Sequence, residues 1–114
     1  MLSEELYKDF RGEIIVYKID GFKFNVLTTK KGMYRGGESH PVAQYTLVLK
    51  GKVEVTLRQN DEDVVIEIGS NELIVIPSNI PHLFKSLTDT VMIHWYDGDS
   101  KSNWYEPYRK LVFE

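Results

Sequence analysis

The stretch RGGESHPVAQ, from Arg35 to Gln44, combines features of a turn with side chains that can carry chemistry. Its two glycines allow backbone conformations that residues with a Cβ rarely adopt, so the chain can bend sharply here. The same ten residues hold a carboxylate, a histidine and an amide, at Glu38, His40 and Gln44, which share strand parity and can face one side. The stretch is therefore either a polar loop between two strands or one half of a functional site.

Short strand patterns surround this stretch. Segments that are rich in β-branched residues or alternate in polarity are separated by turn signals such as Asp20-Gly21 and Lys50-Gly51. They predict about eight strands, over residues 12–19, 22–28, 44–49, 52–58, 64–68, 73–76, 83–86 and 91–96. Little helix is expected: Ser3 could cap one short N-terminal turn, and Pro107 interrupts residues 104–113 and leaves them ambiguous. Many short strands at regular spacing indicate an all-β sandwich or barrel.

Length and composition limit the classes of function. The 114 residues suit one domain over residues 1–114, and the absence of cysteine restricts any transition-metal site to histidine, carboxylate and amide ligands. A net charge of -3 with mixed signs argues against a nucleic-acid partner. No apolar run is long enough to span a membrane, and MLSEELYKDF lacks the basic start and apolar core of a secretory signal, so we expect a cytoplasmic protein without a membrane partner.

A second polar segment, PSNIPH from Pro77 to His82, can complete a site with the first. His40 lies just before one predicted strand and His82 begins another. Two histidines at distant strand entrances converge only if the sheet closes on itself, as it does in a small barrel, whose mouth can hold a ligand. We therefore expect Glu38, His40 and His82 to meet at a barrel mouth.

The residues of both segments resemble the two motifs of the cupin superfamily. Counted back from Gly51, the first motif, G-x5-H-x-H-x3,4-E-x6-G, places Glu38 and His40 at its two histidines and Gln44 at its glutamate. The second, G-x5-P-x-G-x2-H-x3-N, aligns in order with Asn71, Pro77, Asn79, His82 and Ser86. Asparagine is the best non-glycine occupant of a left-handed turn, so its two replacements of glycine are mild. The resemblance covers residues 31–96 and implies a single small double-stranded β-helix, or jelly-roll barrel.

In cupins these motif positions often hold a metal ion. Carried over residue by residue, the resemblance implies that Glu38, His40, Gln44 and His82 are metal ligands. Two histidines and one carboxylate are the minimum of the facial triad that binds non-haem iron. The implied cofactor is a divalent cation, iron, manganese, nickel or zinc, and the implied activity is metal-dependent chemistry on a small molecule.

A narrower resemblance implies a different activity. The first stretch is similar to the R-G-x-H-A-H-K-x-x-Q signature of nucleotide-sugar 3,4-ketoisomerases, small cupins that need no metal for proton transfer. The matching positions are Arg35, Gly36, His40 and Gln44. Glu38 stands at the first histidine, where a carboxylate can act as a base if burial raises its pKa. On this hypothesis Glu38 and His40 are catalytic, Arg35 meets a phosphate and Gln44 orients a hydroxyl.

Simpler interpretations and further candidates remain open. Gln44 could be a buried amide bonded to backbone, and Arg35 could pair with Glu38 or Asp89. The remaining candidates for lining a ligand pocket are Tyr45, Phe84 and His94, the last as an outer-shell residue. The pocket could also belong to a protein that binds a sugar or metabolite without turnover.

The C-terminal stretch WYEPYRKLVF should fold back over the barrel or onto a partner chain, because an exposed apolar tail is uncommon. A jelly roll this short has open strand edges that a second copy can cover, so we expect a homodimer. This expectation rests on analogy with other proteins of the same fold.

Overall fold

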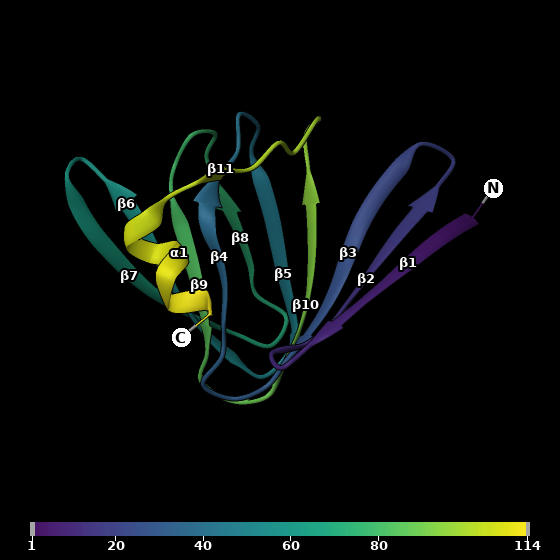
Figure 1. Ribbon diagram of the computed structural model, residues 1–114, viewed down its shortest axis with the longest axis horizontal. Coiled ribbons are helices and arrows are strands. Elements are labelled where there is room, and N and C mark those ends of the chain that lie inside the picture. The colour runs from purple at the N-terminus through teal and green to yellow at the C-terminus, as the bar shows by residue number, and fades with distance from the viewer. Residues whose placement is uncertain (1, 114) are drawn as a thin grey trace.

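The computed structural model describes residues 2–113, which form two antiparallel sheets and one short helix (Figure 1). In chain order the elements are β1 (Leu2–Asp9), β2 (Gly12–Ile19), β3 (Phe22–Thr29), β4 (Tyr34–Ser39), β5 (Gln44–Lys50), β6 (Lys52–Gln59), β7 (Glu62–Gly69), β8 (Leu73–Ile76), β9 (His82–Ser86), β10 (Thr90–Tyr96), β11 (Asn103–Trp104) and α1 (Glu106–Val112). The first sheet has the order β1-β2-β3-β10-β5-β8 and the second β11-β4-β9-β6-β7.

Strands that are distant in sequence interleave in both sheets. β10 lies between β3 and β5, and β9 lies between β4 and β6. Pairing between strands that are far apart in the sequence is characteristic of a jelly roll made of two sheets. The all-β jelly-roll prediction is therefore confirmed.

The core lies between the two sheets, because alternate residues of each strand face inward. It consists of Val48, Val53, Val55, Leu57, Ile68, Ile76, Phe84 and Met92. The interior also holds polar side chains, among them Arg35, His40, Gln44, Thr46, His82 and His94. Buried polar groups are costly unless they find partners, so their presence marks the part of the fold where function is to be sought.

One expectation for local structure is wrong, and one of two open alternatives is excluded. Ser3 does not cap a helical turn, because residues 2–9 form β1, which pairs with β2 along its whole length. The backbone pairing with a β-branched neighbour overrides a weak local preference for helix. The first half of the RGGESHPVAQ stretch is strand β4 rather than a loop, with an irregularity in its pairing between Gly36 and Glu38. Gly36 and Gly37 have φ angles of 95° and 76°, which bend the strand without ending it.

The C-terminal segment folds back onto the second sheet. β11 pairs with β4, and the backbone nitrogen of Tyr105 donates to the carbonyl of Gly37 at 2.9 Å. Tyr108 and Val112 of α1 pack on Leu83 in a second apolar cluster. Pro107 lies in the first turn of α1, where its missing N–H costs nothing, so it begins the helix instead of breaking it.

The hairpin of β1 and β2 leans away from the barrel together with β3, on the side opposite α1 (Figure 1). We call these three strands the N-terminal arm. Among residues 2–113, no helix is long and apolar enough to cross a membrane.

Candidate metal site

Glu38, His40 and His82 meet in space, as the two polar segments led us to expect. Glu38 pairs with His82 across β4 and β9, and His40 follows the end of β4. One ligand atom from each residue lies within 4.8 Å of the others. Both histidines are buried, and Glu38 is half-buried. Their assignment as ligands stays a prediction, but their juxtaposition is a feature of the structure.

The orientation of the two histidine rings is fixed by backbone carbonyls. The Nδ1 atom of His40 lies 3.1 Å from the carbonyl oxygen of Ser100 and 3.3 Å from that of Lys101. The Nδ1 atom of His82 lies 3.0 Å from the carbonyl oxygen of Ile80. A carbonyl only accepts, so each neutral ring must carry its proton on Nδ1 and leave Nε2 as a bare lone pair. Metal-binding histidines are commonly fixed by this kind of contact.

The Nε2 atoms of His40 and His82 are buried without a hydrogen-bond partner among the described residues. His40 Nε2 nevertheless lies 3.0 Å from Glu38 Oε1. An unprotonated nitrogen and a carboxylate oxygen repel each other at this distance, so either a proton on Nε2 or a metal ion must lie between them. A buried polar atom without a partner requires an explanation, and a bound ion supplies one here. The residues therefore fit a divalent transition-metal ion, which accepts imidazole and carboxylate ligands.

The protonation states of Glu38 and His82 are also compatible with a divalent cation at this site. Burial favours the neutral acid of Glu38, but His40, His82 and Arg109 outweigh it and hold the pKa of Glu38 below its usual value. Burial lowers the pKa of His82 to about 4, so its ring stays neutral at pH 7. Burial also disfavours the charged ring of His40, but Glu38 and the carbonyls of Lys101 and Ser100 raise its pKa overall. A proton on His40 would compete with a metal ion for the same Nε2 lone pair.

Aromatic rings enclose the cluster. The ring of Tyr96 meets His40 edge-on at a centroid distance of 4.9 Å. Phe84 lies between His82 and His94, at 5.6 and 5.1 Å, and is almost fully buried. Burial raises the pKa of Tyr96, so its hydroxyl keeps its proton. Sequence reasoning did not select Tyr96 for the site, although its position two residues after His94 on one face of β10 was a usable signal.

Gln44 and His94 form a separate polar pair in the interior. The Gln44 amide nitrogen donates to Thr46 Oγ1 at 3.1 Å and lies 3.3 Å from His94 Nδ1. Gln44 is therefore a buried amide, but its nitrogen contacts side chains and not the backbone that the simpler interpretation named. Its assignment as a fourth ligand stays a prediction.

The structure does not bring Tyr45 or Arg35 to the three-residue cluster. Tyr45 alternates with its buried neighbours, so it lies on the outer face, where it stacks on Trp95 at 5.5 Å and donates to Asp97. Arg35 is buried and donates to the Thr29 hydroxyl at 3.0 Å and the Thr28 carbonyl at 3.1 Å, rather than pairing with a carboxylate.

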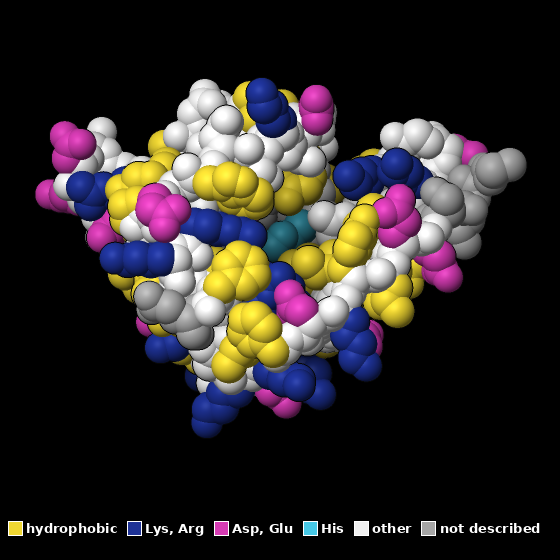
Figure 2. Space-filling model, viewed as in Figure 1, with side chains coloured by type: hydrophobic (Ala, Val, Ile, Leu, Met, Phe, Trp, Pro, Cys, Tyr) yellow, Lys and Arg dark blue, Asp and Glu magenta, His cyan; other side chains and the backbone are white. Residues whose placement is uncertain are grey.

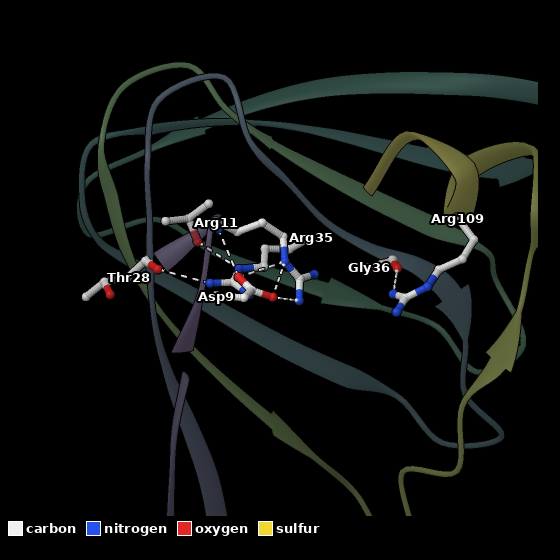
Figure 3. A network of polar contacts seen from close by, with 7 residues as sticks. Asp9, Arg11, Thr28, Arg35, Gly36 and Arg109 are labelled. Atoms are coloured by element: carbon white, nitrogen blue, oxygen red, sulfur yellow. Dashed lines mark hydrogen bonds and ion pairs between the residues drawn. The ribbon is translucent and has the colours of Figure 1, made fainter. Parts of the chain in front are cut away.

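The C-terminal segment supplies groups that sequence reasoning missed. Besides the carbonyls of Ser100 and Lys101, it brings Arg109 to β4, where Nη1 donates to the Gly36 carbonyl at 2.8 Å (Figure 3). Nothing in the local pattern indicated which side chain of the tail would meet β4.

The surface is hollowed between the N-terminal arm and α1 (Figure 2). Histidine atoms are visible at the bottom of this hollow, with apolar and basic side chains around its rim.

A jelly-roll barrel with a His-His-carboxylate cluster in its interior defines a class of β-barrel proteins that could hold a metal ion. A family model described as "Cupin domain" matches residues 25–97, and the chain belongs to the cupin family. A search of curated proteins found no match.

Solved structures of other cupin-fold proteins are similar. CapF in complex with the inhibitor 3-isopropenyl-tropolone is 25% identical, with a TM-score of 0.71 over 85% of this chain and 31% of CapF. The capsular polysaccharide assembling protein CapF from Staphylococcus aureus is 22% identical, with a TM-score of 0.73 over 90% of this chain and 31% of CapF. A deletion mutant of Bacillus subtilis oxalate decarboxylase OxdC is 16% identical, with a TM-score of 0.80 over 90% of this chain and 30% of OxdC. The chain therefore spans about a third of each of these proteins.

Proposed function

We propose that this cupin binds one divalent transition-metal ion through Glu38, His40 and His82 and acts on a small molecule at that ion. The observation that carries the proposal is geometric: one ligand atom each of Glu38, His40 and His82 lies within 4.8 Å of the others, and the Nε2 atoms of both histidines are buried without a hydrogen-bond partner among the described residues. One similar oxalate decarboxylase structure is described by its Mn(II) centres, which supports manganese among the candidate ions.

Each residue of the site has a distinct part in this proposal. A bound ion would supply Lewis acidity and polarise an oxygen of the small molecule. Ser100, Lys101 and Ile80 hold the histidine tautomers, and Glu38 supplies negative charge. Three protein ligands leave coordination positions open for a small molecule, as catalytic metal sites require. The buried ring of Phe84 and the half-buried ring of Tyr96 limit the access of water to the cluster.

Metal analysis by plasma mass spectrometry tests the proposal. We expect close to one equivalent in the wild-type protein after loading with manganese, iron, nickel or zinc, and none in a Glu38→Ala/His82→Ala double variant. His94→Gln, which removes a buried histidine outside the cluster, is the matched control and should keep its metal. Circular dichroism must show that the variants are folded. A wild-type protein that retains none of the four metals would refute the proposal.

A second candidate is metal-free isomerisation or epimerisation of a nucleotide sugar. Its support is the 3.0 Å approach of Glu38 and His40, which could exchange a proton, and the likeness to a capsular polysaccharide assembling protein. Titration of metal-free protein with thymidine and uridine sugar nucleotides, followed by product analysis, tests it. Binding without turnover that survives Glu38→Ala would favour a sugar-binding protein instead, and no binding of any of these nucleotides would exclude the isomerase.

A further inference from the structure

The candidate metal site accounts for only two of the buried side-chain atoms that lack a hydrogen-bond partner. Besides the Nε2 atoms of His40 and His82, the described residues contain two more such atoms, Asn25 Oδ1 and His94 Nε2. Buried polar atoms are nearly always satisfied in folded proteins, so this second pair requires its own explanation.

His94 differs from the two metal-site histidines in its tautomer. The amide nitrogen of Gln44 lies 3.3 Å from His94 Nδ1, and an amide nitrogen only donates. Nδ1 must therefore be bare, and the neutral ring carries its proton on Nε2. His94 Nε2 is thus a buried donor rather than a lone pair, so a metal ion cannot be its missing partner.

Asn25 places an acceptor beside this donor. Asn25 of β3 and His94 of β10 are directly opposite in the antiparallel register, on strands that lie side by side in Figure 1. Side chains at such positions share one face of the sheet, with their Cβ atoms roughly 5 Å apart. An unpaired donor next to an unpaired acceptor matches a group that accepts one hydrogen bond and donates another, as a hydroxyl does.

A cavity lies next to this pair along the same two strands. It measures about 330 Å³, and its lining includes Lys23 of β3 and Tyr96 of β10. Each of these residues is two positions from Asn25 or His94, so it shares that residue's face of the sheet at a distance of about 7 Å along the strand. The volume falls in the range of small-molecule sites.

The same cavity adjoins the candidate metal site. The ring of Tyr96 meets His40 edge-on at 4.9 Å, and Ser100, which also lines the cavity, has its carbonyl oxygen 3.1 Å from His40 Nδ1. The lining carries one cation and one carboxylate, Lys23 and Asp97. It therefore has no excess charge that would select an ion, which favours a neutral molecule.

We infer that Asn25 and His94 form a subsite for a hydroxyl group of a neutral small molecule that occupies the cavity beside Tyr96. The hydroxyl oxygen accepts from His94 Nε2, and the hydroxyl proton is donated to Asn25 Oδ1. The inference rests on the proposed function in one respect, since this molecule is taken to be the one on which the metal ion acts. It narrows the ligand class to neutral hydroxylated compounds.

Long-range proton–nitrogen NMR of the imidazole rings tests the inference in metal-free and in zinc-loaded protein at pH 7. We expect the proton of His94 on Nε2 in both. The ligands added are xylitol and glucose, and at least one should shift the His94 Nε2 resonance in a saturable way. 1,2-Dimethoxyethane, whose oxygens accept but cannot donate, should not produce this shift.

Two variants and one control locate the bound hydroxyl. Asn25→Ala removes the acceptor from a half-buried position, and His94→Phe removes the donor but keeps an aromatic ring. Each should weaken binding of xylitol or glucose about fivefold or more, the effect of one lost hydrogen bond. Asn103→Ala, at an exposed asparagine of β11, should bind as the wild type does. Circular dichroism must show that each variant is folded, and Asn25→Ala suffices if His94→Phe is not.

Three results would overturn the inference: a proton on Nδ1 of His94, no binding of either compound, or equal binding by Asn25→Ala and Asn103→Ala. A crystal structure at saturating xylitol or glucose in which only water, or a direct bond, joins Asn25 to His94 would also overturn it.

The metal content of the same proteins separates this inference from the proposed function. Asn25→Ala that keeps its zinc but loses the hydroxylated ligand supports both. Binding of xylitol or glucose by a protein that takes up no metal would refute the proposed function alone. Metal uptake without binding of either compound would refute this inference alone.

Discussion

The chemistry of His40 and His82 depends on which ring nitrogen carries the proton, and that is decided by carbonyl groups elsewhere in the chain. The motif spacing predicted both histidines and Glu38 from the sequence alone. It could not predict the tautomers, because the carbonyls of Ser100 and Lys101 lie some 60 residues from His40. The resemblance to the cupin motifs also gave no information on Arg109, because the position of this side chain depends on how the C-terminal segment packs on the second sheet.

For a single residue, we predict that His94 makes the free energy of unfolding decrease in mild acid. An unfolded histidine takes up a proton near pH 6.5, whereas burial lowers the pKa of folded His94 to about 3. Between these values the unfolded state binds more protons, so the free energy of unfolding decreases as the pH falls. From pH 7 to pH 5 His94 accounts for a loss of about 2 kcal/mol.

Urea unfolding at pH 7 and pH 5 measures this loss. His82, whose pKa is also lowered, reduces the free energy of unfolding in acid as His94 does, whereas His40, whose pKa is raised, has the opposite effect. The contribution of His94 is therefore isolated by comparing the wild type with His94→Gln. The variant should lose about 2 kcal/mol less than the wild type. Equal losses would show that His94 is not buried in neutral form.

Strand β4 shows why an element could be missed while its neighbours were predicted. Paired glycines break the alternation of polar and apolar residues that identifies a strand, so residues 34–39 looked like a loop. In the fold they form an irregular strand, and the missing side chain of Gly37 makes room for α1. A Cβ at Gly37 would lie 2.6 Å from the Cα of Arg109.

For this element we predict that Gly37→Ala displaces α1 from β4. The substitution meets both an unfavourable φ of 76° and a backbone clash, and should cost about 3 kcal/mol in the free energy of unfolding. Gly21→Ala is the matched control, because φ is 86° there and no atom lies within 4 Å of the added Cβ. It should cost only about 1 kcal/mol. Equal costs in urea unfolding would mean that α1 does not pack on Gly37.

The whole molecule was predictable as a jelly roll because turn signals divide the sequence into many short strands. The pairing of those strands was not predictable from local pattern, since it joins β3 to β10 and β4 to β9 across about 60 and 45 residues. Within the N-terminal arm, β2 and β3 match the strands predicted over residues 12–19 and 22–28, and β1 was missed. Residues 6–9 of β1, with Gly12 and Ile14 of β2, line a cavity of about 400 Å³ beside Arg35.

The outer face of the first sheet carries the strongest indication of a partner. Two rows of apolar side chains cross five strands in register, namely Val75, Tyr45, Trp95, Phe24 and Tyr17, and Leu73, Leu47, Ile93, Val26 and Ile15. Five strands of about seven residues span roughly 24 Å by 23 Å, or about 550 Å² before the relief of the side chains is counted, which is about two thirds of the ~800 Å² that a standard interface takes from each partner. The segment with α1 packs on the other sheet. The homodimer stays a prediction, and we place its interface on this face, where two identical copies can meet about a two-fold axis.

Light scattering coupled to size-exclusion chromatography measures the mass in solution. Val75→Lys lies on the edge strand β8 of this face and should convert a dimer to a monomer. Val65→Lys, at an exposed valine on β7 of the other sheet, should leave the dimer intact. A dimer that only Val65→Lys disrupts would move the interface to the second sheet, and a wild-type monomer would exclude the dimer.

The central claim, a metal ion held by Glu38, His40 and His82, is tested most directly by anomalous diffraction from crystals of manganese- or zinc-loaded protein. We predict one anomalous peak at about 2.0–2.2 Å from both histidine Nε2 atoms and from a Glu38 carboxylate oxygen. A crystal grown with excess metal that shows no peak among these three residues, while the protein is folded, would contradict the account.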